Sequence, residues 1–215
     1  MILTDFVLNI GLEDMKLQYT LLLISSLMAG SGYDHGTAAG KGNLDISLTW
    51  NPLDYFENGQ SYVVLGYGIT DKIDIHGYYS SPVNNNDNYY AGLFYQFYES
   101  NRIDLATAVG LRKYINDDKQ HIFVPQLLYT VKLGGGYEIG GSFVILVEKG
   151  DYLGTVVDAA VYVPIIRKRG NRLIKEVKIG LGVFRPILWK PEWGDWHPTY
   201  SLDVKLNKFN NLFFK

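Results

Sequence analysis

Two alternating segments around a tight turn decide the fold of this chain, and they lie in residues 63–80, VVLGYGITDKIDIHGYYS. Large apolar residues take every second position, and polar residues and glycines lie between them. This period of two is typical of β-strands with one apolar and one polar face. Asp71 and Lys72 separate the segments, so the stretch predicts an antiparallel hairpin. The apolar face holds Val63, Leu65, Tyr67, Ile69, Ile73, Ile75 and Tyr79, and the opposite face holds Gly66, Gly68, Thr70, Asp74, His76 and Ser80.

The same alternation recurs from residue 43 to the C-terminus, and no helical periodicity interrupts it. The first segment, from Leu44 to Trp50, and the last, from Tyr200 to Asn207, show the pattern most clearly. The sequence therefore predicts an all-β protein, an antiparallel up-and-down transmembrane β-barrel of about ten strands within a range of about eight to twelve. Pro125 and Pro164 fall inside predicted strands, where each removes a ladder hydrogen bond and predicts a bulge or a strand end.

The connectors between the predicted strands are of two kinds. Tight turns are expected at Asp71–Lys72, Ser100–Asn101 and Gly134–Gly136, and Arg167–Arg172 is a longer connector on the same side. Short turns at one end and longer loops at the other are the arrangement of bacterial outer-membrane barrels. The longer loops are expected at Asn51–Gln60, Pro82–Asn88, Tyr114–Gln120, Gly150–Gly154 and Pro186–His197.

The residues on the two faces distinguish a membrane barrel from a soluble one. A soluble ligand-binding barrel fills its interior with apolar side chains and carries charge outside. Here one face is large and apolar, and the other mixes charges with glycine and alanine, so the apolar face is expected to contact lipid. Aromatic residues are expected at strand ends, as interfacial girdles require: Trp50, Tyr79, Tyr89, Phe97, Tyr137, Tyr200 and Phe209.

Composition limits the classes of function. The chain has 215 residues, 47% of them hydrophobic, which suits one domain with a sizeable core. It has no cysteine, which excludes disulfides and thiolate metal sites. The formal charge is -2, and removal of the residues before Tyr33 would make it zero. A neutral chain without a basic stripe argues against nucleic acid as a partner.

The N-terminus has the features of an export signal. Lys16 precedes the apolar run Leu21–Met28, and the small residues Ala29–Gly32 follow. This order is that of a secretory signal peptide, and the apolar run is shorter than the roughly 20 residues that span a bilayer as a helix. We expect cleavage between Ala29 and Tyr33. The predicted division is an upstream extension plus signal peptide at 1–32, a short segment at 33–42 and one barrel domain at 43–215.

Two stretches resemble small bacterial outer-membrane β-barrel proteins of the channel-like, porin-like kind. The hairpin Tyr67–Ile75 is similar to a turn phrase common in such proteins. The last predicted strand, Tyr200–Phe209, looks like the signal that barrel-assembly machinery recognises, although the chain continues past Phe209. The resemblance covers residues from about 43 onward. It implies a location in a Gram-negative outer membrane and barrel-assembly machinery as a partner during biogenesis, and it does not resolve a family.

Candidate functional residues lie on the predicted inner face and in one loop. His76 shares its face with Asp74 and Ser80, but residues two apart on a strand lie about 6.6 Å from each other, too far for a catalytic triad. One predicted loop contains Trp189, Trp193 and Trp196. These residues could form a sugar-binding surface, or they could anchor the loop at the membrane interface. No metal-ligand spacing occurs, so neither a metal nor a cofactor is expected. The lumen-lining candidates are Asp45, Asp74, His76, Asp104, Arg112, Glu138, Asp158, Glu176, Lys178, Asp203 and Lys205.

Three functions remain open from the sequence. The first is an outer-membrane barrel without catalysis that serves as a narrow channel or a structural surface protein, with outer-membrane lipid or lipopolysaccharide around it. The second is a lipid-modifying outer-membrane enzyme with its site near His76 or the tryptophan loop. The third is a periplasmic soluble barrel that binds a small apolar ligand. The sequence gives no indication of oligomeric state.

Overall fold

The computed structural model describes residues 35–50, 60–82, 87–115, 117–167, 173–185 and 196–208. Within them the chain forms ten strands, and no helix is long and apolar enough to cross a bilayer. The strands are β1 (Leu44–Trp50), β2 (Gln60–Gly68), β3 (Ile73–Pro82), β4 (Asn88–Glu99), β5 (Ile103–Tyr114), β6 (Asp117–Gly134), β7 (Tyr137–Glu148), β8 (Asp151–Arg167), β9 (Ile174–Arg185) and β10 (His197–Leu206).

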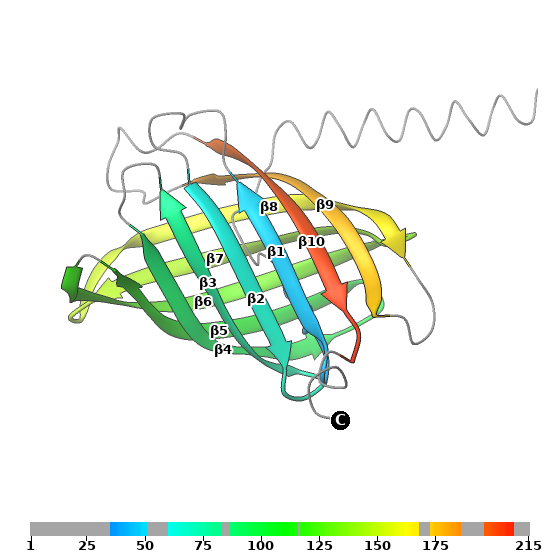
Figure 1. The fold of residues 1–215 in the computed structure, drawn as a ribbon, viewed down its shortest axis with the longest axis horizontal. Coiled ribbons are helices and arrows are strands. Elements are labelled where there is room, and N and C mark those ends of the chain that lie inside the picture. Colours follow the sequence, from blue (N-terminus) through cyan, green and yellow to red (C-terminus); the bar gives the residue numbers. More distant parts are fainter. Residues whose placement is uncertain are drawn as a thin grey trace, which may run out of the picture.

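The strands close into a barrel in which every strand pairs antiparallel with its neighbours in the sequence (Figure 1). The seam joins the first strand to the last, with Leu44 opposite Leu206 and Trp50 opposite Tyr200. Closure leaves no strand edge free for pairing with another chain. The predicted antiparallel barrel of about ten strands is thus confirmed.

Hydroxyl side chains shape two of the tight turns. After β2, the hydroxyl of Thr70 accepts hydrogen bonds from the backbone N–H groups of Lys72 and Ile73. After β4, the hydroxyl of Ser100 accepts in the same way from Arg102 and Ile103. These turns and the β6–β7 turn lie at one end of the barrel, which we call the short-turn end.

Two connectors at the opposite end are shorter than the sequence predicted. β6 begins at Asp117, only three residues after β5 ends at Tyr114, and Lys149 and Gly150 alone join β7 to β8. The expectation of longer loops at 114–120 and 150–154 is therefore wrong. Alternation simply continues: β6 has 18 residues and β8 has 17. The wall of the barrel is consequently taller around these strands.

The two prolines in predicted strands disturb the ladder. Pro164 lies at a register shift between β8 and β9, as its missing N–H group predicts. Pro125 pairs with Val109 of β5, but on its other side the β6–β7 ladder passes from Phe123 directly to Gln126.

The outer and inner faces differ as the alternation predicts. Every strand exposes at least one large apolar side chain, and Leu93 on β4 is 54% exposed. Val161 on β8 is an exception: its place in the alternation predicts exposure, but it is only 3% exposed. The buried polar residues are Asp45, Ser47, Thr49, Asp74, His76, Ser80, Asn88, Gln96, Asp104, Thr130, Ser142, Asp158 and Thr199.

The interior also holds apolar side chains that fill one half of the barrel. Phe94, Leu128 and Val64 pack with three alanines, Ala38, Ala106 and Ala108. A second cluster, of Tyr90, Val124 and Leu146, lies against Tyr78 and Tyr114. Apart from Ala38, which precedes β1, the residues of these clusters come from β2–β7, so this half of the lumen is occupied by side chains.

Candidate functional site

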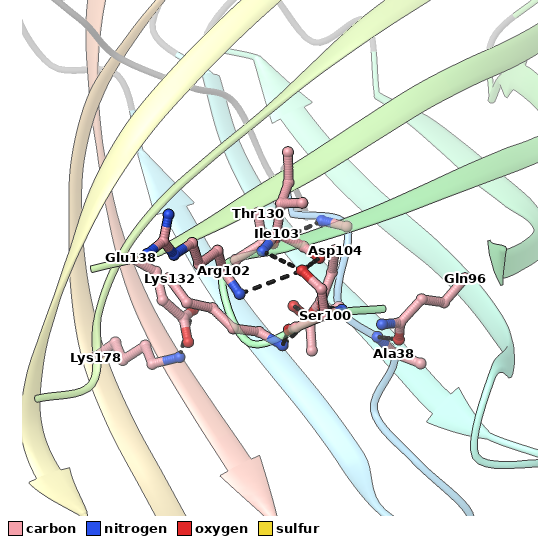
Figure 2. A network of polar contacts seen from close by, with 12 residues as sticks. Ala38, Gln96, Ser100, Arg102, Ile103, Asp104, Thr130, Lys132, Glu138 and Lys178 are labelled. Atoms are coloured by element: carbon pink, nitrogen blue, oxygen red, sulfur yellow. Dashed lines mark hydrogen bonds and ion pairs between the residues drawn. The ribbon is translucent and has the colours of Figure 1, made fainter. Parts of the chain in front are cut away.

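The candidate site is the barrel interior, and its main feature is the chain that precedes β1. Residues 35–43, which we call the inner segment, lie inside the barrel near the short-turn end. Its last residues are tied to β2 by backbone hydrogen bonds: Gly42 N–H donates to Gly68 O over 2.8 Å, and Gly68 N–H donates to Asn43 O over 3.1 Å. From there the segment continues across the inner wall, past the side chain of Gln96 (Figure 2).

Successive residues of the inner segment meet successive strands. Backbone or hydroxyl groups of four consecutive residues donate to side chains on four consecutive strands. An extended chain advances about 3.3 Å per residue and strands lie about 4.8 Å apart; nearer the barrel axis the arc between strands shortens, so one residue can match one strand. The bonds are Ala39 N–H to Asp74 Oδ2 on β3 (2.8 Å), Ala38 N–H to Gln96 Oε1 on β4 (2.8 Å), Thr37 Oγ1 to Asp104 Oδ2 on β5 (2.7 Å) and Gly36 N–H to Thr130 Oγ1 on β6 (2.8 Å).

Two glycines permit this close approach. A Cβ on Gly68 would lie 2.0 Å from the carbonyl oxygen of Gly40, and a Cβ on Gly36 would lie 2.7 Å from the carbonyl oxygen of Asp104. Both obstacles are backbone atoms, so they cannot rotate away as a side chain would. The inner segment therefore docks against the wall only because both positions lack a side chain.

Asp104 joins the inner segment to the turn after β4 (Figure 2). Its carboxylate accepts from Thr37 and from Lys132 Nζ on β6, the latter at 2.7 Å. Lys132 Nζ also donates to the carbonyl oxygen of Ser100 over 3.0 Å. Asp104 has no exposed side-chain surface, and a buried carboxylate is tolerated when it is paired in this way.

Two further lysines organise the charges at the same end. Lys178 on β9 lies 2.8 Å from Glu138 on β7 and 3.1 Å from Glu176 on its own strand. Lys205 on β10 lies 3.2 Å from Asp45 on β1, across the seam, and donates to the carbonyl oxygen of Ala38. Lys205 thus ties the two terminal strands and the inner segment together.

A cavity of about 710 Å³ lies between the inner segment and the wall formed by β1 and β7–β10. The inner segment covers the opposite half of the wall, so the space left near the short-turn end is on this side. Its lining combines charges of both signs with hydroxyl groups. The charged lining residues are Asp45, Glu138, Glu176, Asp203, Arg167, Lys175, Lys178 and Lys205.

A layer of aromatic side chains surrounds Arg112 further along the lumen. The guanidinium carbon lies 5.6 Å from the ring centre of Tyr78 and 5.8 Å from that of Tyr114, and Nε donates to Asn88 Oδ1 over 3.1 Å. These distances are those of cation–π contacts. Tyr78 also stacks on Tyr90 at 5.4 Å between ring centres. The layer adds to the filling of the lumen.

His76 is held in the same layer by an aromatic neighbour. Its Nε2 shares a hydrogen bond of 3.0 Å with the hydroxyl of Tyr90. Asp74, two residues away on β3, contacts the inner segment through Ala39. The geometry thus gives His76 a tyrosine partner and gives Asp74 a role in holding the inner segment.

The predicted lumen-lining residues fall into three groups, and one residue lies apart from them. Asp45, Glu138, Glu176, Lys178, Asp203 and Lys205 come together around the cavity, and Asp74 and Asp104 hold the inner segment. Asp158 lies apart, where it accepts from the backbone N–H and the hydroxyl of Ser142, and Arg112 and His76 belong to the aromatic layer. Of the tryptophan loop, Trp196 is described and exposed, whereas Trp189 and Trp193 lie outside the described residues.

The inner segment was missed by the sequence reasoning, which treated residues 33–42 only as a short N-terminal piece. Its composition offers one signal: Gly36, Ala38, Ala39 and Gly40 are small residues directly before the first strand. Small residues allow close packing against a wall, but they are equally common in linkers. Its partners Gln96 and Thr130 carried no signal of their own.

Within the described residues, no group of three or more acidic or histidine side chains could hold a metal ion. No protein-family model and no curated protein matches the chain. Solved structures that resemble the fold include the KdgM porin, and the KdgM porin in complex with disordered oligogalacturonate. Each has 7% sequence identity, covers 77% of this chain and 98% of its own, and has a TM-score of 0.48.

Proposed function

We propose that this chain is an integral outer-membrane β-barrel without catalysis, with a narrow or closed lumen. The observation that carries the proposal is the distribution of apolar surface around the closed barrel. All ten strands expose large apolar side chains, for example Leu48 on β1, Ile75 on β3, Leu127 on β6 and Leu202 on β10. A soluble monomer rarely exposes contiguous apolar patches beyond a few hundred Å², whereas a transmembrane barrel needs such a belt.

The strand lengths support the same location. A transmembrane strand needs about 9–11 residues, and nine of the ten strands, β2–β10, have at least nine. Exposed aromatic pairs at strand ends fit interfacial girdles: Tyr79 and Tyr89 lie opposite each other near one end of β3 and β4, and Phe97 and Tyr98 lie near the other end of β4. The signal peptide expected at 1–32 would export the chain.

The interior supports a restricted path through the lumen. Barrels of eight strands are just filled by side chains, whereas 16 to 18 strands leave an aqueous channel. Here the inner segment and the aromatic layer occupy much of the lumen, and charged side chains pair with each other. These contacts favour a structural barrel or a narrow channel for small ions. They argue against an open diffusion pore.

Fractionation of cells that express the full chain tests the proposal. We expect the protein in the outer-membrane fraction, resistant to extraction by alkaline carbonate and solubilised only by detergent. Mass spectrometry of the purified protein should place its N-terminus between residues 30 and 33. Recovery in the soluble periplasmic fraction without detergent would contradict the membrane location and favour a soluble barrel.

A further inference from the structure

The cavity beside the inner segment has the size of a small-molecule site. Its volume of about 710 Å³ falls within the range of about 300–1,000 Å³ that is usual for small-molecule sites. His35 and Thr37 of the inner segment form one side. The other side comes from β1 and from β7–β10.

Not every charge that lines this cavity is paired. Arg167 and Lys175 are exposed, so water screens them, although Arg167 Nε lies 3.6 Å from Glu176 Oε1. Behind them, two lysines face four carboxylates: Lys178 is shared by Glu138 and Glu176, and Lys205 pairs with Asp45. Asp203 forms no ion pair with any residue of the described ranges. Of the four carboxylates in the lining, that of Asp203 therefore remains without a compensating positive charge.

Two carboxylate oxygens in the cavity wall also lack hydrogen-bond partners. Asp45 Oδ1 and Asp203 Oδ1 are both buried, and neither has a donor within the described part of the chain. Asp45 as a whole is only 8% exposed. Buried polar atoms in native proteins nearly always have a partner, and an unpaired buried charge is costly. Asp45 and Asp203 are diagonal neighbours across the seam, because Asp45 pairs with Lys205 and Ser47 pairs with Asp203.

We propose that this cavity binds a primary ammonium group, held by the carboxylates of Asp45 and Asp203. An ammonium group has three N–H donors and one positive charge. It can therefore satisfy both orphan oxygens and a hydroxyl such as that of Ser47 while reducing the excess negative charge. A metal ion fits less well, because no group of three metal-ligating side chains exists within the described residues.

The ammonium group has two sources. One is a free primary amine that enters the cavity. The other is the chain itself: cleavage between Ala29 and Tyr33 would create a new α-amino group a few residues before His35, which lines the cavity. An extended chain spans at most about 3.6 Å per residue, so this group could reach the carboxylates. This proposal does not depend on the membrane location, since it concerns the inside of the barrel.

Thermal unfolding and N-terminal acetylation of the purified mature protein test the proposal and separate the sources. Unfolding is followed in methylammonium chloride and in sodium chloride at equal ionic strength. Acetylation with a reagent selective for α-amino groups is followed by mass spectrometry in native and denatured protein. Asp203→Asn removes one of the two carboxylate charges of the proposed site. Asp158→Asn is the matched control, because it removes a buried lumen carboxylate that is already satisfied by Ser142.

If a free amine is the ligand, the parent unfolds at a higher midpoint temperature in methylammonium chloride than in sodium chloride. Asp158→Asn shows the same difference between the two salts, and Asp203→Asn shows none. If the N-terminus is the ligand, the native parent is acetylated several-fold more slowly than the denatured parent, and Asp203→Asn removes this protection whereas Asp158→Asn keeps it. Equal acetylation together with equal midpoints in both salts overturns the proposal. These parent measurements decide the matter even if Asp203→Asn does not fold.

Discussion

Gly36 and Thr130 are joined by a buried hydrogen bond of 2.8 Å, although 94 positions separate them in the sequence. The bond connects the inner segment to β6 and is one of four that place this segment against four consecutive strands. We therefore expect Thr130→Ala to destabilise the barrel by about 1–3 kcal/mol, because the Gly36 N–H remains buried without an acceptor. Denaturant unfolding of the refolded protein measures this free energy.

Thr107→Ala is the matched control for Thr130→Ala. The hydroxyl of Thr107 on β5 also forms a hydrogen bond, which it donates to the carbonyl oxygen of Gln126, but Thr107 is exposed. Its replacement should change the free energy of unfolding by no more than about 0.5 kcal/mol. Equal effects of the two substitutions would show that the bond between Gly36 and Thr130 adds nothing to stability.

The outer face is tested by arginine substitutions at two depths. Leu93 lies in the middle of β4, and Leu93→Arg should cost about 2–4 kcal/mol if this position is at the bilayer midplane. Ile69 lies in the turn after β2, so Ile69→Arg should cost only about 0–1 kcal/mol near the interface. Folding into lipid vesicles in increasing denaturant provides the measurement. Insertion of Leu93→Arg as readily as the parent would mean that this face does not contact lipid.

Topology is tested with epitope tags in two connectors. We predict that Asn85, between β3 and β4, faces the outside of the cell, together with the connectors around Asp117, Asp151 and Trp193, and that Asp71 and Gly135 face the periplasm. An antibody should label intact cells that carry the tag at Asn85, and should label the Asp71 tag only after permeabilisation. The reverse pattern would invert the orientation of the barrel.

Conductance in planar bilayers tests the state of the lumen. The inner segment, the ion pairs and the aromatic layer around Arg112 leave little free path, so we expect no measurable current or a small one. Any current should favour cations, because the lumen-lining residues predicted from the sequence include seven carboxylates and three basic side chains. A large, stable and anion-selective current would contradict both the packing of the lumen and the inward position of those carboxylates.

Much of the wall of the barrel follows from the sequence alone. Residues 63–80 already fix a hairpin and the side to which each of its residues points, because side chains alternate strictly along a strand. The same rule assigns Leu93 to the outside and Asp104 to the inside. The rule does not predict where strands end. β6 and β8 continue through residues whose composition resembles that of loops, because pairing with neighbouring strands decides where a strand ends.

Only the tertiary structure decides what fills the lumen. No local pattern joins Ala38 to Gln96 or to Lys205, because these contacts exist only once the sheet closes and brings β1 next to β10. The same closure creates the cavity and sets Asp45 near Asp203, two carboxylates that are 158 positions apart in the chain. The sequence by itself determines which side chains point inward, since that depends on a period of two. Which of them meet depends on the curvature of a closed sheet, which a single strand does not contain.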